Sequence, residues 1–192
     1  MQSEPAQQGR RALEAAHRGT GLTLSHYQSA RDFLLVALTR TVGTHPGALE
    51  SATIGQLRNA SWDGQKRTKV MLVTSHKRQV EGPAPIPLNA ELAEDMEVFI
   101  RRLRPLVNQD NSDNAKIFLK SDGAPYQKGT IGQRITAFVV KTGVRADRPI
   151  SATDFRKWLV TVMKDAKRRG DPLDEDLLRR LMCHSEKTAH TW

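Results

Sequence analysis

Apolar residues recur at three- and four-residue intervals along most of this chain, and this helical spacing constrains its fold more than any other feature. Residues suited to helix N-caps precede the apolar stretches, among them Ser25 with Gln28, Asn89, and Ser151 with Asp154. Helices are therefore predicted over about 25–42, over a short segment from 46, over about 90–104 and 131–142, from 151 onward, and over about 171–183. The apolar positions of the helix from 151 are expected to line the core: Phe155, Trp158, Leu159, Val162 and Met163.

Two short segments depart from the helical pattern. Residues 69–75 and 80–88 are typical of extended strands, and the prolines of the second suit an edge strand. Together they predict a hairpin with His76, Lys77 and Arg78 at or near its turn. The predicted fold class is therefore mainly α with a small antiparallel β-sheet or hairpin. Residues 1–20 hold few large apolar side chains and are expected to be a flexible tail or linker, with 21–192 forming one domain.

The charge balance limits the classes of partner. The 30 lysine and arginine residues against 21 acidic ones give a net charge of +9, which favours a polyanion such as nucleic acid, because neutralising phosphates releases counterions. No run approaches the ~18 apolar residues of a membrane span, and the single cysteine, Cys183, excludes an internal disulfide. We expect a soluble, intracellular protein. Cys183 is next to His184 but has no second cysteine near it, so neither a metal nor a cofactor is expected.

One pair of residues in the helix from 151 is suited to binding a phosphate. Thr153 and Arg156 are three residues apart and therefore neighbours on the helix surface, followed by Lys157. A guanidinium offers two parallel donors to a phosphate, which an ammonium does not. The alternative interpretation, a solvated helix face, is the usual one for an isolated arginine.

Three segments give this pair a wider context. The segment 150–156, the His184–Ser185 step and Lys77 on the predicted hairpin resemble the motifs of tyrosine recombinases, the phage-integrase family. The resemblance covers about residues 24–192 and implies the family's DNA breaking-rejoining fold. It places Arg156 at the second catalytic arginine, His184 at the third basic position and Lys77 at the lysine that protonates the leaving 5′-hydroxyl. In the family, such cations stabilise the charge that builds on the phosphate as a tyrosine attacks it.

Two positions depart from the family pattern. His45, in the segment 43–50, stands where the family has its first catalytic arginine, and Ala48 stands at an acidic position. Thr153 stands where most members have histidine. A neutral imidazole supplies one donor where arginine supplies two and a permanent charge, so catalysis is expected to be impaired.

The closing segment is cut short relative to the same motif. Counting nine residues from His184, the family's spacing to its tyrosine, ends one position past Trp192. Neither Tyr27 nor Tyr126 is in the nucleophile's register. The sequences of segments 46–52, 76–84 and 184–189 most resemble those of eukaryotic mobile-element recombinases of the Crypton type. This resemblance implies a nuclear location if the source is eukaryotic.

We therefore expect a domain that binds duplex DNA and that could form a homo-oligomer on it. Without the tyrosine, these 192 residues are not expected to cleave DNA. The residues expected to contact DNA are His45, Lys77, Arg78, Arg156, Lys157 and His184. Two alternatives remain open. The chain is a fragment of an active recombinase whose tyrosine follows Trp192, or it is a protein-interaction module that retains the fold.

Overall fold

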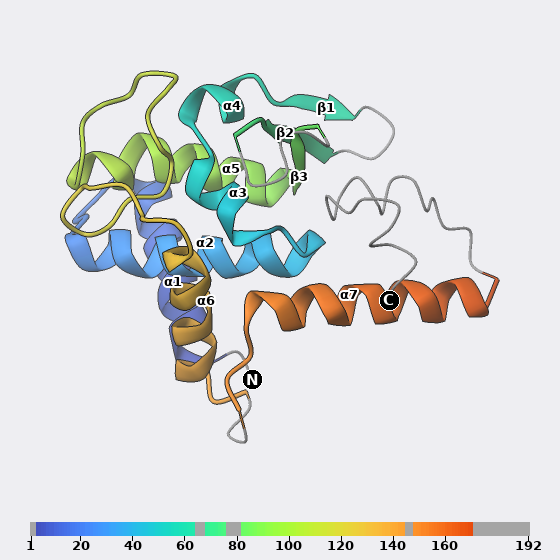
Figure 1. The fold of residues 1–192 in the computed structure, drawn as a ribbon. Helices are drawn as coiled ribbons and strands as arrows, with labels where there is room; N and C mark the ends of the chain where they lie inside the picture. Colours follow the sequence, from blue (N-terminus) through green and yellow to red (C-terminus); the bar gives the residue numbers. More distant parts are fainter. Residues whose placement is uncertain (1–2, 64–67, 76–81, 145–147, 171–192) are drawn as a thin grey trace.

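The computed structural model describes residues 3–63, 68–75, 82–144 and 148–170 (Figure 1). Its helices are α1 (Glu4–Arg18), α2 (Leu24–Val42), α3 (Pro46–Ser51), α4 (Ile54–Arg58), α5 (Ala90–Val98), α6 (Thr130–Lys141) and α7 (Ala152–Arg168). A π-helical turn, η2 (Phe99–Leu103), and a 3-10 turn, η3 (Arg104–Leu106), continue α5. The strands are β1 (Ser61–Asp63), β2 (Thr68–Val73) and β3 (Ala84–Asn89). The predicted fold class, mainly α with a small antiparallel sheet, is confirmed.

Helix α2 is the centre around which the other elements pack. Its apolar side chains are fully or almost fully buried: Tyr27, Ala30, Leu34, Leu35 and Leu38. The helix begins as predicted, but its capping box joins Thr23 with His26 and not Ser25 with Gln28. Gln28 instead donates a hydrogen bond to Ser121 Oγ at 2.7 Å.

The N-terminal segment differs from the flexible tail that we expected over residues 1–20. Residues 4–18 form α1, which crosses α2 closely and buries Ala12, Leu13 and Ala16. At the crossing, a β-carbon on Gly9 would lie 2.3 Å from Cβ of Phe33. Small side chains make this contact, so the helix forms an interface although its sequence holds few large apolar residues.

The three strands form an antiparallel sheet in the order β1-β2-β3, with Met71 opposite Ile86 and Val73 opposite Ala84. Alternate residues of β2 and β3 face the core, because side chains alternate between the two faces of a strand. The predicted hairpin is therefore confirmed. Its connection, with His76, Lys77 and Arg78, lies outside the described residues.

The helix after β3 begins and ends as predicted. Asn89 caps α5 by accepting a hydrogen bond from the amide of Leu92 at 2.8 Å, and the helical path ends in η3 with Pro105. In η2, Phe99 stacks on Tyr27 with ring centroids 5.4 Å apart and contacts Phe118 at 5.8 Å. These aromatic contacts join the helices to the loop that follows η3.

Helix α6 buries its predicted apolar positions, but α7 only partly does so. Ile131, Ile135 and Phe138 are buried in α6. In α7, Trp158 is 57% exposed and Val162 is 38% exposed, which corrects the prediction that this stripe lines the core. The physical reason is that α7 packs on α2 through its first turns and then extends away from the other described helices (Figure 1). The predicted helix over 171–183 lies outside the described residues.

Within the described ranges, no helix combines the length and the apolar composition that a bilayer span requires.

Candidate nucleic-acid interface

A cleft of about 1230 Å³ opens between α3, α6 and the start of α7. It gathers side chains that are far apart in the sequence. The lining groups that bear on its chemistry are His45, Lys116, Tyr126, Lys128, Gln133, Thr153 and Arg156. Of the residues predicted for the site, the structure therefore brings His45, Thr153 and Arg156 together.

Arg156 is positioned by the way α7 begins. The helix starts with the predicted capping box between Ser151 and Asp154, whose carboxylate accepts from the Ser151 amide at 2.9 Å. Arg148 donates two hydrogen bonds to the same carboxylate, at 2.9 and 3.2 Å. The Arg148 guanidinium, and then the Ser151 amide, hold the pKa of Asp154 well below its usual range. The first turn is thus fixed before Arg156, which lies one turn further on.

The turn between α2 and α3 brings Arg156 against the domain. Gly43 adopts a left-handed conformation with φ of 62°, and a β-carbon there would lie 3.1 Å from Cγ of Arg156. Leu159 also reaches this turn, with its Cδ2 3.5 Å from the same point. Only glycine meets both demands without strain, the left-handed φ and the close approach.

His45 is the N-cap of α3, and this role sets its protonation. Its Nδ1 accepts a hydrogen bond from the amide of Gly47 at 3.0 Å. A ring nitrogen that accepts carries no proton, so the ring is neutral in this arrangement and Nε2 holds its single proton. His45 therefore supplies neither the charge nor the paired donors of an arginine.

Helix α6 forms the wall of the cleft that faces α3. Glu50 of α3 accepts a hydrogen bond from the amide of Ile131 at 3.1 Å, which caps the start of α6. On another side of α6, Arg134 donates two hydrogen bonds to Asp32 of α2, at 2.8 and 2.7 Å. The hydrogen bonds that Arg134 donates to the Asp32 carboxylate raise the pKa of Arg134. The first turns of α6 are thus held to α3 by Glu50 and to α2 by Asp32.

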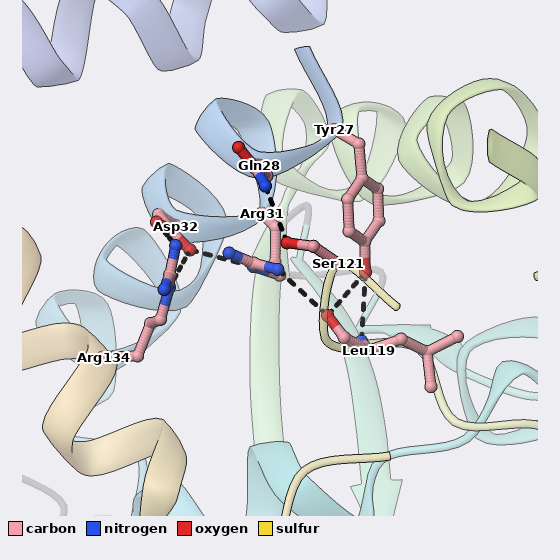
Figure 2. Close-up of polar contacts among 7 residues, drawn as sticks. All are labelled: Tyr27, Gln28, Arg31, Asp32, Leu119, Ser121 and Arg134. Atoms are coloured by element: carbon pink, nitrogen blue, oxygen red, sulfur yellow. Dashed lines mark hydrogen bonds and ion pairs between the residues drawn. The ribbon is translucent and has the colours of Figure 1, made fainter. Parts of the chain in front are cut away.

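A buried arginine lies behind this wall (Figure 2). Arg31 is 1% exposed and donates to Asp32 at 2.9 Å and to the carbonyl of Leu119 at 3.2 Å. Its Nη2 has no hydrogen-bond partner among the described residues. The guanidinium carbon lies 5.4 Å from the ring centre of Tyr27 and 5.8 Å from that of Tyr126. These cation–π interactions help to stabilise the buried charge.

The two tyrosines do not present a ready nucleophile. The hydroxyl of Tyr27 is buried between the carbonyl and the amide of Leu119, at 2.7 and 3.1 Å, and burial raises its pKa to about 12. Tyr126 lines the cleft, but burial raises its pKa as well. A raised pKa disfavours the phenolate that would attack a phosphate.

The other predicted site residues are not among the described residues that line the cleft. Lys157 is exposed but does not line the cleft. Lys77, Arg78 and His184 lie outside the described residues, so their positions stay predictions. Over the described parts of the chain, no group of three or more histidine, cysteine or acidic side chains is arranged to hold a metal ion.

Sequence reasoning missed four residues of the cleft: Lys116, Tyr126, Lys128 and Gln133. Lys116 also donates to the carbonyl of Ser51 at 2.8 Å, which joins the loop to α3. The first three come from the irregular segment before α6, which has no periodicity that could show which way a side chain points. The one available signal was the excess of basic residues. The cleft as a whole combines a guanidinium, two ammonium groups and neutral donors with one carboxylate, that of Glu50, which the Ile131 amide already contacts. The excess of cationic donors suits a phosphate ester.

This arrangement of helices around a small sheet is the fold of the catalytic domains of tyrosine recombinases. Among solved structures, the chain is similar to the XerA recombinase (17% identity, TM-score 0.58), covering 96% of this chain and 56% of that one. It is also similar to the XerH site-specific recombinase bound to its difH substrate (15% identity, TM-score 0.58), covering 95% of this chain and 47% of that one. A third similar structure is the Tn1549 transposon integrase in complex with transposon right end DNA (16% identity, TM-score 0.56), covering 97% and 58%.

The chain thus spans about half the length of the solved structures that it matches. No protein-family model matches it, and no curated protein matches it.

Proposed function

We propose that this domain binds duplex DNA, with the phosphate backbone in the cleft between α3, α6 and α7. The observation that carries the proposal is the meeting of Arg156, Thr153 and His45 in one cleft with Lys116 and Lys128. The net charge of +9 agrees with it. The similar XerH and Tn1549 structures are complexes with DNA, which supports the same partner here.

In this account Arg156 clamps a phosphate, and Lys77, Arg78 and His184 add donors from segments outside the described residues. A resemblance of three motif segments to Crypton-type recombinases supports an origin in a mobile element and, if the source is eukaryotic, a nuclear location; otherwise the location is cytoplasmic. Assembly of several copies on the DNA is part of the same proposal.

We further propose that the site favours binding over strand cleavage. The support is His45, whose Nδ1 caps α3 and whose ring is therefore neutral where the family has an arginine. Removing one donor to a developing oxyanion typically costs on the order of 10²- to 10³-fold in rate. Thr153 at the family's histidine position removes a second cation.

Two measurements test the proposal. Affinity for a duplex is measured over a salt series, and phosphate binding predicts a steep linear fall of log affinity with log salt. A suicide DNA substrate is then tested for a covalent adduct on a denaturing gel. No salt-dependent affinity would favour the protein-interaction module instead, and a robust adduct would show an active recombinase.

A further inference from the structure

A second hollow lies outside the cleft, between α4, β2, the turns η2 and η3 and the loop that follows η3. It has a volume of about 560 Å³, and of the described residues that line it, none lines the cleft. Its apolar lining comes from Ile54, Leu57, Ile100 and Pro105. Four cationic side chains and one carboxylate, that of Glu97, also line it; the cations are Arg58, Lys69, Arg101 and Arg104. The hollow therefore combines apolar surface with an excess of positive charge.

Arg104 places a buried positive charge at the wall of this hollow. It is 2% exposed and donates hydrogen bonds to the carbonyls of Lys116 at 2.8 Å, of Asn108 at 3.2 Å and of Asp110. Within the described ranges it forms no ion pair and its Nη2 donates no hydrogen bond, while the Asp110 carboxylate accepts from the Ser112 amide at 3.0 Å. Burial lowers the pKa of Arg104, because the charged form loses solvation. Since buried charges in proteins are usually paired, this guanidinium favours an anion in the hollow.

Arg101 adds a second cation to which a ligand could bind. Its side chain is exposed and, in the part of the chain that the structure describes, forms no ion pair or hydrogen bond. The remaining two cations, Arg58 and Lys69, are paired with carboxylates at 2.7 and 2.9 Å. Arg101 and Arg104 are thus the cationic groups of the hollow that are available to an anionic ligand.

The local backbone presents Ile100 and Arg101 together. Both belong to η2, the π-helical turn of Phe99–Leu103, in which Phe99 and Leu103 are fully buried. Turns of this kind are rare and occur frequently at functional sites. An apolar and a cationic side chain are therefore neighbours on a turn that its buried residues hold in place.

We propose that the hollow binds an acidic peptide segment of a partner protein. An apolar side chain of that segment packs beside Ile100, and its carboxylates pair with Arg101 and Arg104. Arginine clusters recognise acidic motifs in this way, because a guanidinium donates two parallel hydrogen bonds to a carboxylate. A DNA backbone fits this surface less well, since it leaves the apolar lining without a partner and is repelled by Glu97. The inference is independent of the proposed DNA binding, which uses the cleft.

The test begins with an array of short peptides that carry one leucine, isoleucine or phenylalanine among several aspartates and glutamates. At low salt, wild-type protein is expected to bind a subset of them. Replacing the acids of a bound peptide by their amides, or its apolar residue by glycine, should abolish binding. Fluorescence anisotropy with a bound peptide then measures the affinity. Arg101→Glu should lower this affinity about tenfold or more, as expected for the loss of a hydrogen bond between charged groups.

Lys164→Glu is the matched control, because it makes the same change of charge at an exposed position of α7 that does not line the hollow. Its affinity for the peptide should stay close to wild type. Equal losses from both variants would show attraction by net charge alone and overturn the inference, as would an array without any bound peptide. A duplex affinity that falls for Arg101→Glu but not for Lys164→Glu would also overturn it, because the hollow would then hold a DNA phosphate. A protein that binds the peptide but no duplex would support the inference and overturn the proposed function.

Discussion

Gly43 and Arg156 lie so close together that no side chain fits between them, although 112 residues lie between the two in the sequence. A β-carbon on Gly43 would lie 3.1 Å from Cγ and 3.4 Å from Cα of Arg156. The turn that ends α2 is thus packed against the helix that carries Arg156. The position of Arg156 in the cleft depends on the absence of a side chain at this turn.

Gly43→Ala should therefore affect both stability and DNA binding. The left-handed φ of 62° costs an alanine on the order of 1 kcal/mol, and the contact displaces Arg156. Gly143→Ala is the control, because its φ is 67° but nothing lies within 4 Å. Urea unfolding should show a lower free energy of unfolding for both variants. A separate binding measurement should show a lower DNA affinity for Gly43→Ala alone. Equal losses of affinity would show that the contact does not position Arg156.

The pairing of Asp32 with Arg31 and Arg134 should be a major contribution to stability. Asp32→Asn leaves the guanidinium of Arg31, 1% exposed, without its counter-charge. Breaking a buried pair in this way typically costs about 3–5 kcal/mol. Asp113, paired with Arg58 and 68% exposed, is the control, and its change to asparagine should cost less than about 1 kcal/mol. Urea unfolding measures both, and similar small losses would contradict the structural role.

Introducing an arginine at position 45 should strengthen DNA binding and weaken the fold. His45→Arg adds a charge and paired donors but removes the N-cap of α3, which typically costs about 0.5–2 kcal/mol. His45→Asn keeps a capping group without charge, so it should retain stability without a gain in affinity. Duplex affinity over a salt series should rise for the arginine variant alone, with a slope steeper by about 1. An unchanged affinity would mean that the position does not face a phosphate.

The start of α7 should respond to acid through Asp154. Its pKa is lower in the folded chain than the reference value of about 3.9 in an unfolded one. The stability that Asp154 contributes is therefore complete above about pH 4 and is lost as pH falls through its lower folded pKa. Unfolding curves below pH 4 should show a steeper loss for wild type than for Asp154→Asn. Parallel pH profiles would exclude this contribution.

The sequence predicted the elements whose packing is carried by large apolar residues, with a recognisable cap in the case of α5. Helix α5, with its cap at Asn89, and the apolar side of α6 are examples. Helix α1 was not predicted because small residues such as Gly9 and Ala12 make its contacts with α2. A segment with few large apolar residues has the composition of a linker. The exposed Trp158 shows the opposite case, where an apolar stripe was visible but its partner was not.

The motifs predicted that three residues distant in the sequence belong to one site, and the structure shows that these three line one cleft. His45, Thr153 and Arg156 were placed by their motifs, and the described cleft contains them. The presence of Lys116 and Lys128 in the cleft could not be predicted, because both belong to an irregular segment without periodicity. The capping role of His45 was hidden too, since a histidine is not among the common N-cap residues.

We propose Arg156 as the main phosphate-binding residue of this domain. Its most direct test is duplex affinity over a salt series for wild type, Arg156→Ala and Lys164→Ala. Lys164 is exposed on the same helix and does not line the cleft. We expect Arg156→Ala to lower the duplex affinity about tenfold or more, as expected for a hydrogen-bonded charge, while the affinity of Lys164→Ala stays close to wild type. Equal losses from both variants would show a diffuse basic surface and contradict the account.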